Sequence, residues 1–103
     1  MAYKEVTASL TLPADKSPVT VLVFNTASLV SATITPHGKA EKVVRGCEGV
    51  FTLQPEQQLI YSSAEFSNFV TGQDVEIRLR AADAVAVSVS VLYCYDEGKA
   101  AGV

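Results

Sequence analysis

Apolar residues recur at every second position along three segments of the chain, residues 6–12, 75–81 and 85–95. A period of two residues places successive side chains on opposite faces of a β-strand, so each segment is predicted to be a strand with one buried face. At eleven residues, 85–95 is long for a strand of a small domain. Its second face carries small residues and would allow another sheet or subunit to approach closely.

Shorter apolar runs supply the other predicted strands. They are residues 19–26, 30–34, 50–53 and 59–61. The first of these is apolar on both faces, which indicates a central strand or one whose outer face meets a partner. Pro55 lies in the turn between the last two runs, and Ala82-Asp83 separates 75–81 from 85–95. The first junction is predicted to be hairpin-like and the second a tight turn.

Two stretches fit no clear strand pattern. Residues 37–49 are the longest polar stretch and contain three glycines, although Val43 and Val44 could form a brief strand within it. In 62–71, Phe66 and Phe69 are spaced as in a helix, so this segment is either a single helical turn or an irregular plug at one end of a sandwich.

The pattern as a whole predicts an all-β fold. Seven to eight short strands, with turn signals about every ten residues, indicate a small antiparallel β-sandwich that is jelly-roll or Greek-key-like. The length of 103 residues fits a single domain, 1–103, with short flexible tails at 1–4 and 97–103.

Charge is scarce in this chain, at 18% of residues against 49% hydrophobic. Either other subunits cover part of the surface, or Ser and Thr replace charge on solvated strand faces. The net charge of −3 argues against nucleic acid as a partner, because binding phosphates requires a concentrated basic surface. The longest nearly apolar stretch, 84–92, is too short to span a bilayer as a helix, so no membrane partner is expected.

The residues that could carry chemistry are few and scattered. His37 is the single histidine and lies in the predicted turn Pro36-His37-Gly38, where a solvated side chain is the expected state. Cys47 and Cys94 match no metal spacing, and their pairing in a disulfide is left open. No catalytic residues, metal or cofactor are therefore predicted, and the chain is expected not to be an enzyme.

Five cations are candidate contacts to a partner protein. Arg78 and Arg80 share one strand face and could bind carboxylates of a partner protein. Alternatively, they form a charged outer face that discourages edge-to-edge pairing of sheets. Lys39, Lys42 and Arg45 could form a small basic patch in the polar loop, although two interleaved acids also suit a solvated loop.

The chain resembles a family of small virion proteins. The likeness lies in residues 72–81 and 85–93, which are similar to the closing hairpin of such proteins, and in residues 51–60 before them. Together they look like the β-sandwich decoration, or cement, proteins of tailed bacteriophage capsids. This resemblance implies binding to the outside of a capsid, often as trimers that clamp neighbouring major capsid proteins, with no catalytic residues.

The expected function is therefore that of a virion structural protein on the capsid surface, made in the host cytoplasm. Its expected partners are other copies of itself, with a trimer favoured, and the major capsid protein. The alternative is a carbohydrate-binding or adhesin-type β-sandwich of a phage fibre or cell surface, with Tyr61, Phe66 and Phe69 as candidate aromatic contacts.

Overall fold

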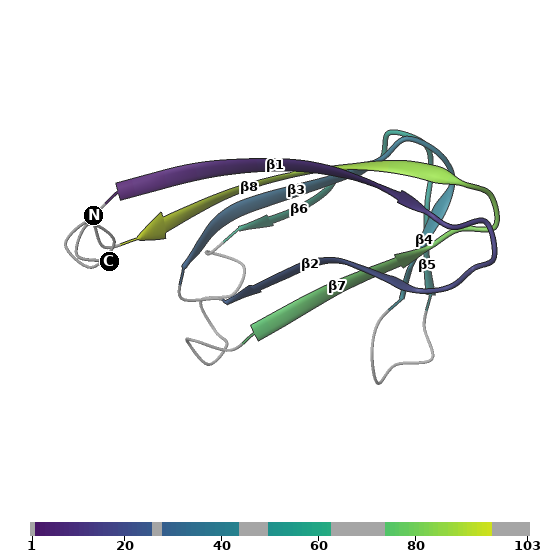
Figure 1. The fold of residues 1–103 in the computed structure, drawn as a ribbon, viewed down its shortest axis with the longest axis horizontal. Helices are drawn as coiled ribbons and strands as arrows, with labels where there is room; N and C mark the ends of the chain where they lie inside the picture. The colour runs from purple at the N-terminus through teal and green to yellow at the C-terminus, as the bar shows by residue number, and fades with distance from the viewer. Residues whose placement is uncertain (1, 26–27, 44–49, 63–73, 96–103) are drawn as a thin grey trace.

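The structure, a computed structural model, describes residues 2–25, 28–43, 50–62 and 74–95 of the chain. Within these ranges the chain forms eight strands and no helix. The strands are β1 (Ala2–Leu12), β2 (Val19–Asn25), β3 (Leu29–Pro36), β4 (Ala40–Val43), β5 (Val50–Leu53), β6 (Leu59–Ser62), β7 (Asp74–Arg80) and β8 (Val85–Tyr95). Two layers result, as Figure 1 shows: one sheet has the order β1-β8-β3-β6 and the other β2-β7-β4-β5.

The strands are nested like a long hairpin that has been rolled up. β4 pairs with β5, β3 with β6, β2 with β7 and β1 with β8, all antiparallel. Rolling then brings β8 against β3 and β7 against β4. This is the jelly-roll arrangement of two four-stranded sheets. The predicted all-β antiparallel sandwich is confirmed.

The hairpin predicted at Pro55 and the closing hairpin that the resemblance implies on either side of Ala82-Asp83 are both wrong. β7 and β8 lie in different sheets, so Ala82-Asp83 carries the chain across the sandwich, and the turn at Pro55 likewise carries it from β5 to β6. A turn signal shows that the chain reverses. It does not show whether the next strand stays in the same sheet, because that depends on pairings made far away in the sequence.

The core lies between the sheets and consists of side chains at alternate positions. Leu12, Ile34, Leu53, Leu79 and Val87 are completely or almost completely withdrawn from solvent. Each such side chain stabilises the fold by about 1.5–3 kcal/mol through burial. No polar or charged side chain is buried among the residues described. The core therefore depends on shape and hydrophobicity alone.

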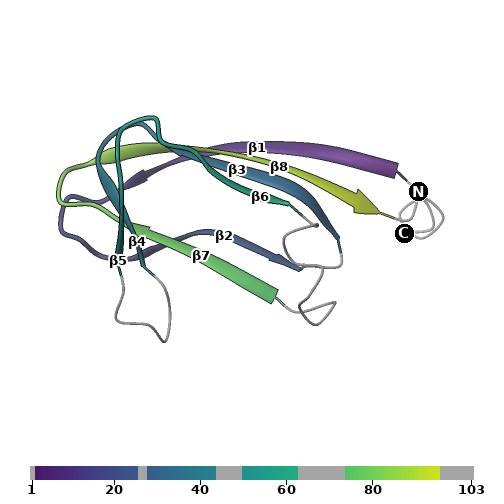
Figure 2. The ribbon, with the colours of Figure 1, turned by 180° about the vertical axis from the view of Figure 1, so that it is seen from behind.

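β1 and β2 are edge strands, and both differ from expectation. Residues 2–4 belong to β1 and pair with β8, so the predicted flexible tail at 1–4 is wrong for them. Residues 3–9 are all exposed, and only the last part of β1 reaches the core. β2 pairs with β7 alone, so it is not a central strand. In Figures 1 and 2, β1 and β8 extend past the end of β2 and β7.

Several other expectations fall partly or wholly outside the described ranges. Residues 37–49 contain β4, which begins at Ala40, and residues 44–49 are not described. The ambiguous segment 62–71, apart from its first residue, and the tail 97–103 also lie outside. Among the described residues, no helix is long and apolar enough to cross a membrane.

Candidate functional site

The two predicted contact arginines on β7 are both engaged within the chain. Arg80 Nε donates to Glu41 Oε1 at 3.0 Å across the β4–β7 pairing. Arg78 Nη2 donates to Glu76 Oε2 at 2.8 Å along β7. Arg78 and Arg80 therefore share one outer face of the sandwich, as the sequence predicted, but their charges are already matched by carboxylates of this chain.

The predicted basic loop does not form a single patch. Lys42 lies on β4, with its Nζ 5.8 Å from the ring centroid of Phe51 and 5.3 Å from that of Tyr61. Lys39 instead lines a shallow hollow next to Lys16 and the β7–β8 connection. Arg45 is outside the described residues. The structure therefore separates Lys42 from Lys39, and from the arginines on the outer face of β7.

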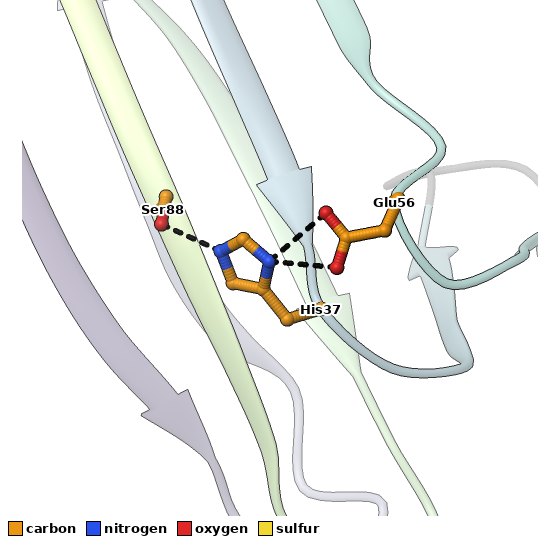
Figure 3. A network of polar contacts seen from close by, with 3 residues as sticks. All are labelled: His37, Glu56 and Ser88. Atoms are coloured by element: carbon orange, nitrogen blue, oxygen red, sulfur yellow. Dashed lines mark hydrogen bonds and ion pairs between the residues drawn. The ribbon is translucent and has the colours of Figure 1, made fainter.

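Within the described ranges, Ser88, His37 and Glu56 form a connected set of potentially reactive side chains. Ser88 Oγ lies 2.7 Å from His37 Nε2, and Glu56 Oε1 and Oε2 lie 2.9 and 3.2 Å from His37 Nδ1. Figure 3 shows the imidazole between the hydroxyl and the carboxylate. The expectation of a solvated histidine without partners is wrong in this respect, although the side chain remains 39% exposed.

Main-chain hydrogen bonds hold these three residues in place. His37 N–H donates to Ala86 O at 2.8 Å, which fixes the end of β3 against β8. Glu56 N–H donates to Pro36 O at 2.8 Å, which ties the turn after β5 to the same point. Within that turn, Gln57 N–H donates to Gln54 O at 3.0 Å. Glu56 has a φ of 67°, a left-handed conformation that glycine adopts more easily.

The contacts decide which ring nitrogen of His37 carries the proton. An ionised carboxylate can only accept, so the proton of the neutral ring lies on Nδ1, which donates to Glu56. Nε2 then presents a lone pair and accepts the hydroxyl proton of Ser88. This is the arrangement in which a histidine can draw a proton from a serine hydroxyl.

A polar hollow of about 470 Å³ adjoins Ser88 on the outer face of the first sheet. Hydroxyl side chains from β1, β3 and β8 line it: Thr7, Ser9, Thr33, Thr35, Ser88 and Ser90. None of the lining residues carries a charge. The hollow therefore suits a neutral polar group better than an ion.

The main-chain donors around Ser88 are already used in the sheet. Because His37 N–H donates to Ala86 O, the even-numbered residues of this part of β8 point their backbone groups toward β3. By the same alternation the N–H of Ser88 bonds to Thr35 and that of Val89 to Ala8. A substrate oxygen at Ser88 would have to be received by side-chain donors, which are the hydroxyls and the amide of Gln58.

Apolar side chains lie exposed near the edges of both sheets. The large ones among them are Tyr3, Val6, Val23, Val50, Phe51 and Ile60. Val6 and Val23 also line a hollow of about 350 Å³ between β1 and β2, at the end where the first sheet extends past the second. These residues are a second candidate site, for association with a protein surface.

Cysteines and metal ligands add little to either site. Cys94 has a free, half-buried thiol, while Cys47 lies outside the described residues. In the part of the chain that the structure describes, no three His, Cys, Asp or Glu side chains gather as metal ligands would. Phe66 and Phe69 are also outside, and Tyr61 packs near Phe24, with ring centroids 6.5 Å apart.

Comparison with known proteins bears on the fold alone. The chain resembles the solution structure of a de novo designed double-stranded β-helix, with a TM-score of 0.50 and 19% identity over 88% of this chain and 99% of the other. The likeness is consistent with the two antiparallel sheets of this chain. No protein-family model and no curated protein sequence matches the chain. At 19% identity the likeness assigns no activity, substrate or partner to this chain.

Sequence reasoning missed the contact of His37 with Ser88 and Glu56 because its partners are 51 and 19 residues away. One local signal was present. Pro36-His37 and Pro55-Glu56 are both proline-led polar pairs, and each follows a predicted strand. That both turns lie at the same end of the sandwich follows only from the jelly-roll pairing.

Proposed function

We propose that this chain is a structural protein that acts by binding other protein chains. It decorates a viral capsid as an oligomer, with a trimer favoured. Its partners would be further copies of itself and the major capsid protein. One observation carries the proposal: β1 is a long, exposed edge strand that neither proline nor a bulge protects and that carries no charge from Val6 to Leu12.

The open edge of β1 follows from the strand register. The odd-numbered residues of β8 point their backbone groups toward β1, and they pair with even-numbered residues there, such as Val6 with Val91. The N–H and C=O groups of the odd-numbered residues of β1 therefore face outward. They belong to Tyr3, Glu5, Thr7, Ser9 and Thr11.

Natural sheets usually protect such an edge with proline, a bulge, charged side chains or a very short strand. β1 has eleven residues, contains no proline and pairs with β8 without a register shift. Its charged residues, Lys4 and Glu5, lie in its first half, so the edge from Val6 to Leu12 carries no charge. Exposed Val6 and Tyr3 add apolar surface beside the open hydrogen-bonding groups. These features favour a partner that adds a strand to β1.

A ring of three copies requires β1 to contact a different surface of the next copy, because a contact between two identical edges would close as a dimer. The edge strand β5 offers such a surface, since Val50 and Phe51 are exposed on it. The low charge of the chain supports the same interpretation.

Light scattering coupled to size exclusion tests the association. The full chain is expected to elute at three times the 10.9 kDa mass of one copy. Thr7→Pro removes an outward N–H and should give monomers, whereas Thr7→Val keeps the N–H and should leave the oligomer intact. A wild-type chain that stays monomeric at about 100 μM would overturn the proposal.

The capsid partner is tested separately. The chain is produced together with the major capsid protein encoded nearest to its gene, and assembled shells are pelleted. Wild-type protein should pellet with the shells and Thr7→Pro should remain in solution. If no capsid gene lies in the neighbourhood, or if the protein stays in the supernatant, the capsid part of the proposal fails.

A second candidate function is the binding of a neutral carbohydrate, favoured by the uncharged, hydroxyl-lined hollow beside Ser88. The predicted aromatic contact Tyr61 does not line that hollow. Binding to a glycan array that is lost in Thr35→Val, while Thr20→Val on the other sheet still binds, would support this candidate. An array without signal would remove it.

A further inference from the structure

We propose that Ser88 is a nucleophile activated by His37 and oriented through Glu56, and that this site cleaves small neutral carboxylic esters. The proposal goes beyond association and does not depend on it. It concerns the outer face of the first sheet, whereas association is assigned to the free edge of β1.

The first support is the continuity of the three contacts. Ser88 Oγ, the two ring nitrogens of His37 and the Glu56 carboxylate form one chain of hydrogen bonds with links of 2.7 and 2.9 Å. These are the lengths expected between a nucleophile, its base and an orienting group. The three residues come from β8, from the end of β3 and from the turn after β5, so the fold assembles the set from three separate segments.

The second support is the backbone of Glu56. A non-glycine residue with a φ of 67° carries a conformational cost, and such costs cluster at functional sites. The second central position of this proline-containing turn would ordinarily favour glycine. Glu56 adopts this conformation despite its cost, and its carboxylate then contacts His37 Nδ1.

The hollow beside Ser88 defines the class of substrate. Its volume of about 470 Å³ and its uncharged lining suit a small neutral ester, with hydroxyls available to the acyl and alcohol oxygens. Because the strand N–H groups of Ser88 and Val89 are used in the sheet, the oxyanion would depend on side-chain donors of the lining, which are the hydroxyls and the amide of Gln58. The site should therefore act on activated esters and turn over slowly.

The reaction balances with water as the second reactant. Ser88 Oγ bonds to the carbonyl carbon while its proton moves to His37 Nε2. The bond from the carbonyl carbon to the alcohol oxygen then breaks, and the alcohol leaves with that proton. Water attacks the resulting acyl-serine, His37 takes a proton from it, and Ser88 regains its hydroxyl as the carboxylic acid departs.

Covalent labelling gives the sharpest test. Diisopropyl fluorophosphate should phosphorylate Ser88, with loss of fluoride, and mass spectrometry of peptides should locate the label there. Ser90, two residues along the same strand, and Thr35 on the neighbouring strand serve as internal comparisons. Labelling spread equally over these hydroxyls, or no labelling of Ser88, would overturn the proposal.

Substitutions distinguish a Ser88 hydroxyl that is activated by His37 from one that is merely exposed. His37→Gln should slow both labelling and p-nitrophenyl acetate hydrolysis about 100-fold. Glu56→Gln should slow them by a smaller factor, and Ser31→Ala should leave both unchanged. If His37→Gln is labelled as fast as the wild type, the contact is structural and the proposal is wrong.

Discussion

Lys42 Nζ on β4 lies 5.3 Å from the ring centroid of Tyr61 on β6, so a cation from one sheet meets an aromatic face from the other. The ring of Phe51 on the neighbouring β5 lies 5.8 Å from the same ammonium group. Lys42 pairs with Phe51 and with the fully buried Leu79 in the sheet, so it projects from the face that looks toward the opposite sheet. The cation thus links the two layers near the sandwich edge formed by β5 and β6.

Removal of this charge should weaken the fold. Lys42→Gln keeps a polar side chain but loses the attraction to both rings, and we expect the free energy of unfolding to fall by about 0.5–2 kcal/mol. Urea denaturation measures the change. Lys39→Gln, at an exposed position, is the matched control and should change stability by less than about 0.5 kcal/mol. Equal effects of the two substitutions would show that the ring contacts contribute nothing.

The two arginine–carboxylate pairs on the outer face of the second sheet should differ in strength. Glu41 and Arg80 side chains are 27% and 29% exposed, while those of Glu76 and Arg78 are 40% and 36% exposed. Glu41→Gln should therefore cost about 1 kcal/mol and Glu76→Gln less than about 0.5 kcal/mol. In 1 M NaCl the cost of Glu76→Gln should fall by a larger fraction than that of Glu41→Gln, because salt screens the more exposed pair more strongly. A larger cost for Glu76→Gln would contradict this ranking.

The hydrogen bond from Ser17 N–H to Asp15 Oδ1, 3.0 Å long, holds the pKa of this carboxyl below its ordinary value of 3.8. A folded-state pKa below the unfolded value stabilises the fold above the unfolded pKa, and the contribution is lost as the pH falls through the folded pKa. The NMR titration midpoint of Asp15 should therefore lie below 3.8. Ser17→Ala keeps the main-chain donor and should retain most of the lowering. A midpoint above 3.8 would contradict the assignment.

The sequence allowed the strands to be predicted better than their partners. Residues 75–81 and 85–95 alternate so regularly that the strands were located to within a residue or so. Their membership of opposite sheets was not predictable, because β7 pairs with β2 and β8 with β1, and the paired residues are at least 49 positions apart in the chain. The alternation of apolar residues along a strand determines which of its faces is buried. Pairing with distant segments determines which sheet contains the strand.

The candidate sites were predictable to a smaller extent. Arg78 and Arg80 share a strand face because they are two residues apart, and period two is enough to show this. The meeting of His37 with Ser88 requires β3 to lie beside β8 in one particular register, with Pro36 opposite Val87. No local pattern specifies that register.

Two isoleucines test where the structure places the core. Ile34 on β3 is 0% exposed and Ile60 on β6 is 59% exposed, although the two strands are neighbours in one sheet. Ile34→Ala leaves a cavity between the sheets and should cost about 2–5 kcal/mol. Ile60→Ala removes a solvated side chain and should cost less than about 1 kcal/mol, mainly through lower strand propensity. Thermal or urea unfolding of both variants measures the two losses of stability. Similar losses would mean that β6 presents its other face to the core.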